Sequence, residues 1–315
     1  MSDAVVSGDP LAIRFKRFPP PDGHLLVPLT GRKDAVAALD LYPASRKSAI
    51  VALRLARAGV ALFGPRLLPG RSRVWRPETG EEAIRALADA WSEAIGAWDS
   101  LAVLERSQPE LAGFSALLMR EGEGVAFVKV RTRDGGLETE RIALERVEAY
   151  DPETFRSPEV LAHGAAGAWA WLAMSAVPIR SRGTVRDLDV DAVVAEIQAA
   201  LEGWTRPADV PEEWRPMHGD FTPWNVRGAG AGETLLVDWE YAGWGPPEAD
   251  RVLWHATRAA LEDPDRVPGA PASATAFWRE VVADRRQGGE RDRRLSAGIE
   301  RALSRMERRR ASEVR

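Results

Sequence analysis

The sequence predicts an α+β protein in which a small antiparallel sheet is followed by a mainly helical region. Two observations support this fold class. Between residues 101 and 176, short apolar runs alternate with turn signals and enclose one helical stretch. After residue 190 the apolar residues recur mostly at helical spacing. Three strands, a helix and two more strands are typical of an antiparallel sheet with one helix against it.

The composition excludes several classes of protein. The chain has 315 residues, a formal net charge of −4 and no cysteine, which rules out disulfides, thiolate metal sites and a cysteine nucleophile. No apolar run reaches the length of a transmembrane helix, and the first ten residues do not resemble a signal peptide. We therefore expect a cytoplasmic protein with neither a nucleic-acid nor a membrane partner, and composition leaves its oligomeric state open.

The first part of the chain contains two short predicted strands and two predicted helices. Residues 1–21 are polar and proline-rich, as in a loose terminus. The apolar stretches His24–Leu29 and Ala35–Leu39 predict strands around a polar turn. Helices are predicted over 45–63 and 81–98 from apolar residues at helical spacing.

The remaining elements follow in the order that the fold class requires. Strands are predicted at 101–104, 113–119, 125–130, 159–162 and 169–176, with a turn at 163–167 and a helix at 137–150. Further helices are predicted at 190–204, 250–262 and 275–284. The tail from residue 285 predicts an amphipathic helix with a solvated basic face.

Lysine is rare in this chain, which draws attention to one position. There are four lysines against 39 arginines, and only Lys129 lies after Lys47. Lysine is a compact point charge, whereas arginine is a wide planar fork. Lys129 lies near the end of the strand predicted at 125–130.

The densest cluster of unusual residues lies between His218 and Gly245. Asp220 is followed five residues later by Asn225, and Asp238 ends an apolar run after a glycine-containing connection that predicts a hairpin. Mg²⁺ prefers such oxygen ligands, with phosphates and waters completing its octahedron. Asn225 and Asp238 would bind the metal, and Asp220 would face an acceptor hydroxyl. The catalytic loop of protein kinases has the same Asp-x-x-x-x-Asn spacing.

The sequence His218-Gly-Asp-Phe-Thr-Pro-Trp-Asn225, followed by Val237-Asp-Trp-Glu240, resembles the aminoglycoside phosphotransferase and choline kinase superfamily. The resemblance is specific over residues 216–253 and weaker, but in the right order, over about 100–177. It implies a bilobal protein-kinase-like fold with a small sheet-containing N-lobe and a mainly helical C-lobe. The corresponding domains are an N-terminal extension at 1–98, an N-lobe ending in the hinge at 99–177, and a C-lobe at 178–315.

The resemblance also implies roles for individual residues. Asp220 matches the catalytic aspartate that orients the acceptor hydroxyl and takes its proton, and Asn225 and Asp238 match the two Mg²⁺ ligands. Lys129 matches the strand lysine that holds the α- and β-phosphates. Its expected helix partner is Glu140.

Two other glutamates on the same helix are alternative partners of Lys129. Glu145 is the second choice and Glu138 the third. The sequence does not decide between Glu140 and Glu145.

Supporting roles follow from the same resemblance. His218 would support the catalytic loop through hydrogen bonds, and Asp250 would brace it. The hinge, whose backbone would bind the purine, is expected at Met174, Ser175, Ala176 and Val177. One departure concerns the expected phosphate-covering loop at 107–113, which has a single glycine.

These residues imply an ATP-dependent phosphotransferase, with GTP as an alternative donor and Mg²⁺ as cofactor. The γ-phosphoryl group would pass to a hydroxyl of a small molecule: an aminoglycoside, a sugar, an amino alcohol or a related metabolite. A non-catalytic nucleotide-binding scaffold on the same fold is the alternative. A protein-substrate kinase is disfavoured because no segment resembles the stretch from Asp-Phe-Gly to Ala-Pro-Glu.

Overall fold

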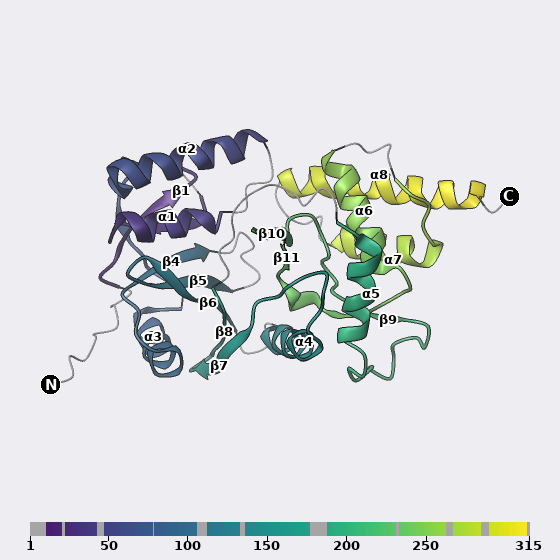
Figure 1. The fold of residues 1–315 in the computed structure, drawn as a ribbon, viewed down its shortest axis with the longest axis horizontal. Helices are drawn as coiled ribbons and strands as arrows, with labels where there is room; N and C mark the ends of the chain where they lie inside the picture. The colour runs from purple at the N-terminus through teal and green to yellow at the C-terminus, as the bar shows by residue number, and fades with distance from the viewer. Residues whose placement is uncertain are drawn as a thin grey trace. The chain divides into compact units, whose positions relative to one another are not determined.

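The structure is a computed structural model that describes residues 11–20, 23–42, 47–77, 79–105, 112–132, 136–176, 188–230, 233–262, 267–284 and 290–313. It divides into two compact units, which are described separately (Figure 1). The first comprises residues 1–137, 158–183 and 228–231. The second comprises residues 138–157, 184–227 and 232–315.

The first unit is built on an eight-stranded antiparallel sheet with the order β3-β1-β2-β4-β5-β6-β8-β7. Its strands are β1 (Arg14–Phe18), β2 (Leu25–Pro28), β3 (Arg73–Val74), β4 (Ser100–Glu105), β5 (Gly113–Arg120), β6 (Glu123–Thr132), β7 (Val160–Ala166) and β8 (Trp169–Met174). Strands from residues 1–98 are thus hydrogen-bonded into the same sheet as those from 99–177.

Helices cover both faces of this sheet (Figure 1). Successive strand residues point to opposite faces, so Leu101 and Val103 pack against α3 (Glu81–Ile95), whereas Ala102 packs on the other side. There the sheet contacts α1 (Arg32–Asp40), and α2 (Lys47–Phe63) packs against α1, with the 3₁₀ turn η1 (Pro65–Leu67) after α2. Each face therefore has its own apolar core.

Three local predictions in this unit are wrong. The loose terminus expected at 1–21 contains strand β1, which pairs with β2 and β3 and buries Phe15 and Phe18. Ala35–Leu39 belongs to helix α1 and not to a strand, because its buried residues Ala35, Ala38 and Leu39 follow the spacing of one helix face. The turn expected at 163–167 is shorter than predicted, since β7 continues to Ala166 through its pairing with β8.

The second unit is mainly helical. It contains α5 (Val190–Ala200), α6 (Ala249–Leu261), α7 (Ala272–Asp284), α8 (Glu290–Glu313) and all but the first residue of α4 (Leu137–Tyr150). Its short strands are β9 (Arg215–Met217), β11 (Glu233–Leu236), β12 (Gly243–Gly245) and the start of β10 (Val226–Gly230), with the 3₁₀ turn η2 (Trp239–Tyr241).

One apolar cluster holds the helices of this unit together. Trp278 of α7 belongs to this cluster, and its indole N–H donates to the Ala249 carbonyl of α6 at 2.7 Å. Leu303 and Met306 of α8 complete the cluster, as the helical spacing in the tail predicts. The α+β class, with a sheet-based and a mainly helical unit, is confirmed. In the part of the chain that the structure describes, no helix combines the length and apolar character needed to cross a membrane.

Candidate active site

Asp250, in the first turn of α6, fixes the start of the loop that contains Asp220. Its two carboxylate oxygens accept the backbone N–H groups of His218, at 2.7 Å, and of Gly219, at 3.1 Å. Burial raises the pKa of Asp250 to about 7, the two N–H groups oppose this rise, and the charge of Asp220 adds to it. The carboxyl group therefore works as a buried brace for two consecutive peptide groups.

His218 connects the loop to the strand that precedes Asp238. Its Nδ1 accepts the Asp220 N–H at 3.2 Å, so the proton resides on Nε2, which donates to the Val237 carbonyl at 3.2 Å. The ring is fully buried and lies 4.5 Å from the ring of Trp239. His218 thereby orders the segments carrying Asp220 and Asp238.

Gly219 has a structural reason to lack a side chain. Its φ of +77° lies in the left-handed region, and a Cβ atom there would be 1.9 Å from the Tyr241 carbonyl oxygen. The backbones of the loop and of η2 can approach this closely only at glycine. This contact accounts for the glycine in the His-Gly-Asp sequence.

Asp220 and Asn225 are hydrogen-bonded to each other. The Asn225 Nδ2 donates to the Asp220 carboxylate at 2.8 Å and to the Asp220 carbonyl at 3.0 Å, which leaves Oδ1 as the atom able to bind a cation. The Asn225 carbonyl accepts the Val237 N–H at 3.0 Å. That bond sets Asp238, the next residue, beside the loop.

Three carboxylates gather at Asp238. One oxygen each of Glu140, Asp238 and Glu240 lies within 4.8 Å of the others. Asp238 adopts a left-handed backbone conformation, with φ of 72°, and the next residue, Trp239, donates its N–H to Glu140 at 3.2 Å. Such an oxygen-only donor set fits a hard cation such as Mg²⁺. The sequence argument missed Glu240, although its spacing of two from Asp238 was visible.

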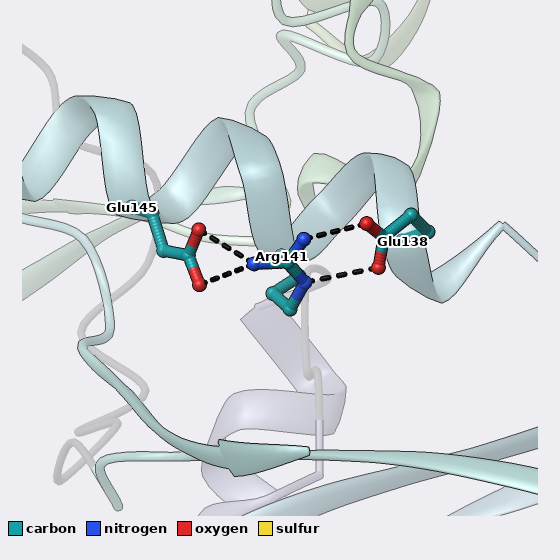
Figure 2. A network of polar contacts seen from close by, with 3 residues as sticks. All are labelled: Glu138, Arg141 and Glu145. Carbon is teal, nitrogen blue, oxygen red and sulfur yellow. Dashed lines mark hydrogen bonds and ion pairs between the residues drawn. The ribbon is translucent and has the colours of Figure 1, made fainter. Parts of the chain in front are cut away.

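The three glutamates considered on α4 differ in their surroundings. Arg141 lies between Glu138 and Glu145 on the helix surface (Figure 2). Its guanidinium group donates to the Glu138 carboxylate at 2.9 Å and to the Glu145 carboxylate at 2.6 Å. Glu140 is 1% exposed. Of the three, Glu140 is therefore the buried carboxylate, and Glu138 and Glu145 form surface ion pairs.

Arg227 is a second residue that the sequence argument missed. It lies on β10, two residues after Asn225, and its Nε is buried without a hydrogen-bond partner in the described part of the chain. Burial lowers the pKa of its guanidinium group, and the charge of Asp238 opposes this effect. A half-buried guanidinium group, with its Nε buried, thus interacts electrostatically with Asp238 of the acidic cluster. In the sequence, the one indication of this role is that Arg227 directly follows an apolar residue in the predicted hairpin.

The other predicted site residues belong to the first unit. Lys129 is 6% exposed on β6, and because Val128 and Val130 pack toward α3, its side chain points to the opposite face of the sheet. Met174 is buried at the end of β8. Ser175 donates its N–H to the Glu159 carbonyl and accepts the Glu159 N–H on its hydroxyl.

Part of the expected nucleotide site cannot be placed. Ala176 is half-buried, and Val177 lies outside the described residues. The expected phosphate-covering loop is described only from residue 112 onward. The structure thus brings Asp220, Asn225 and Asp238 together in one unit, with Glu140 beside Asp238.

Several solved structures are similar to this chain at low identity. A spectinomycin phosphotransferase, APH(9)-Ia, in complex with ADP and spectinomycin is 7% identical over 70% of this chain and 93% of its own, with a TM-score of 0.46. The aminoglycoside phosphotransferase APH(3'')-Id from Streptomyces rimosus ATCC10970, in complex with ADP and streptomycin, is 16% identical over 70% of this chain and 98% of its own, with a TM-score of 0.39.

A protein assigned as a fructosamine-3-kinase in Haemophilus somnus 129PT is 11% identical over 71% of this chain and 98% of its own, with a TM-score of 0.47. Likeness at this level assigns no reaction to the chain. None of the curated proteins compared with the chain matches it.

A family model does match, and it covers the loop described above. Residues 179–277 match the model of the phosphotransferase enzyme family, a range that includes His218, Asp220, Asn225, Asp238 and Asp250. The match indicates phosphotransferase chemistry in general terms. The resemblance carried by the His218–Asn225 and Val237–Glu240 segments, both of which lie within the matched range, is thereby confirmed.

Proposed function

We propose that this protein transfers the γ-phosphoryl group of ATP to a hydroxyl group of a small molecule. The observation that carries the proposal is the hydrogen bond between Asp220 and Asn225, in a loop tied at Val237 to the carboxylate cluster of Asp238. A carboxylate for the acceptor and oxygen ligands for a cation are thus built into one backbone assembly. GTP is the alternative phosphoryl donor.

The reaction needs little covalent chemistry from the protein. The acceptor oxygen forms a bond to the γ-phosphorus, the bond to the β–γ bridging oxygen breaks, and ADP leaves. Asp220 orients the hydroxyl and accepts its proton. Positioning is the main contribution of the loop, because Asp250 and His218 hold Asp220 before substrate arrives.

Asn225 Oδ1 and the Asp238 carboxylate would hold Mg²⁺, and Glu240 extends this set of oxygens. When bound, the ion would neutralise the charge of the β- and γ-phosphates. Lys129 is proposed to hold the α- and β-phosphates with Glu140 as its partner. The burial of Glu140, and the engagement of Glu138 and Glu145 with Arg141, support this choice.

The acceptor is proposed as a class: an aminoglycoside, a sugar, an amino alcohol or a related metabolite. A non-catalytic nucleotide-binding scaffold is the alternative function. A scaffold has no chemical use for an aspartate, Asp220, that is held by Asn225 in a loop whose first two peptide groups are bound by Asp250. The geometry therefore favours catalysis.

A panel of hydroxyl acceptors assayed with ATP and Mg²⁺, coupled to ADP detection, tests the proposal. Asp220→Ala should abolish transfer while nucleotide binding, measured by a thermal shift with ATP and Mg²⁺, stays within about twofold, since Asp220 is assigned to the acceptor. Asp209→Ala, at an exposed loop position of the same unit, is the matched control and should retain activity. Transfer by Asp220→Ala at the wild-type rate would refute the assignment, and nucleotide binding without transfer to any acceptor would favour the scaffold.

A further inference from the structure

Helix α2 carries an exposed apolar surface that the proposed reaction does not use. Of the ten large hydrophobic residues exposed in the described part of the chain, six lie between residues 51 and 74. Five of them form what we call the α2 surface: Val51, Leu55, Leu62, Phe63 and Leu67. Their exposed fractions range from 55% to 72%. Such a concentration is unusual on a protein surface and marks an interaction site.

The residues of this surface lie on one side of the helix. Val51, Leu55 and Leu62 follow a spacing of four and seven residues, so they share a face that extends along most of α2. Leu53 and Val60 are buried on the opposite face, in the apolar cluster that α2 shares with α1 and the sheet. The helix therefore has one apolar face that fills the core and a second that is left exposed.

The turn after α2 extends the same surface. Leu67 of η1 lies against Gly59, where a Cβ atom would be 2.9 Å from the leucine Cδ2. The ammonium group of Lys16 donates to the carbonyls of Arg66 and Leu68, which fixes this turn on β1. Leu67 is thus held next to α2.

The charged residues of the segment that forms this surface are all basic. Residues 41–77 contain eight basic residues and no acidic one, in a chain whose net charge is −4. Asp40 of α1 is paired with Arg57 at 3.0 Å. The exposed basic residues of the segment are Arg54, Arg66, Arg71, Arg73 and Arg76. A partner must therefore offer negative charge together with an apolar phase.

We propose that the α2 surface docks onto an anionic lipid bilayer, with α2 parallel to the membrane plane. Exposed Leu, Val and Phe side chains beside arginines are typical of helices that lie in the lipid interface. A dimer formed through this surface would place two basic segments, neither with an acidic residue, next to each other, and charge repulsion disfavours this arrangement. An anionic leaflet supplies both the charge and the apolar phase.

This proposal is independent of the proposed function and changes one sequence-based expectation. The expectation of no membrane partner rested on the lack of a spanning segment. A helix on the surface needs no such segment, because only one of its faces enters the lipid.

The lack of cysteine allows a direct test in the full-length protein. A single cysteine introduced as Leu62→Cys can be labelled with an environment-sensitive fluorophore. With vesicles of phosphatidylcholine and about 30 mol% phosphatidylserine, we expect a several-fold gain in emission, and none with pure phosphatidylcholine. Leu261→Cys, a 44% exposed leucine at the end of α6, is the matched control and should show no gain. An unchanged signal at residue 62 would overturn the proposal.

Vesicle co-sedimentation of unlabelled protein separates the contributions of the basic and the apolar residues to membrane binding. Arg54→Glu should lower the partition coefficient by more than about fivefold, since each basic residue near an anionic surface contributes about 1 kcal/mol. Arg85→Glu, at an exposed position of α3, should have a smaller effect. Leu55→Glu should lower partitioning by more than about tenfold, because a charge replaces an apolar contact.

Raising the salt from about 0.1 M to about 1 M should release the protein, because the screening length falls from about 10 Å to about 3 Å. Binding that is equal with neutral and anionic vesicles would contradict the proposal. A dimer in sedimentation equilibrium that Leu55→Glu dissociates, without vesicle binding, would assign the surface to a second copy instead.

Discussion

Gly219→Ala provides the sharpest test of the loop geometry, because the chain offers a matched control. Gly219 and Gly203 have φ values of 77° and 75°, but a Cβ at Gly203 would meet no atom within 4 Å. Alanine in the left-handed region costs about 1–2 kcal/mol at either position. At Gly219 the new Cβ would also lie 1.9 Å from the Tyr241 carbonyl oxygen, a backbone atom that can move only with η2.

Overpacking adds about 1–3 kcal/mol, so Gly219→Ala should destabilise the protein by that much more than Gly203→Ala. Urea denaturation followed by tryptophan fluorescence measures both variants, provided that the m-value is unchanged. Displacement of η2 should also reduce phosphoryl transfer in Gly219→Ala and leave it intact in Gly203→Ala. Equal losses of unfolding free energy in the two variants would refute the close approach of Gly219 to Tyr241.

Three further predictions concern the braces and packing of the second unit. Since the pKa of Asp250 is raised from 3.8 to about 7, the folded state retains a proton that the unfolded state releases, so the unfolding free energy should fall as pH rises through this range. Asp250→Asn should flatten that slope in urea titrations at several pH values, and an unchanged slope would contradict the assignment. Arg141→Ala should cost less than about 1 kcal/mol and leave turnover intact, because its ion pairs lie on the helix surface. A large loss of activity in Arg141→Ala would indicate instead that Glu138 or Glu145 takes part in catalysis. Trp254→Ala should cost about 3–5 kcal/mol in the same assay, since Trp254 is buried and stacks on Phe221 at 5.0 Å, and a loss below about 1 kcal/mol would show that this packing is not formed.

Local sequence patterns were sufficient where a single periodicity dominated. The five strands between residues 100 and 174 and the helix α4 were predicted within a few residues, because burial on a sheet or a helix face imposes a period that is visible in the chain. The prediction for Ala35–Leu39 failed because a short apolar run fits either period. Its alanines favour the helix that forms.

The sequence by itself determined the fold class and the resemblance of the His218–Asn225 segment, since both depend on residues close together in the chain. Only the tertiary structure placed Glu140 and Glu240 beside Asp238 and showed why residue 219 must be glycine. It alone revealed that one apolar face of α2 is exposed, because periodicity shows that a helix has apolar faces but not which of them finds a partner. Contacts between residues distant in sequence depend on how the whole chain packs, and no local pattern contains them.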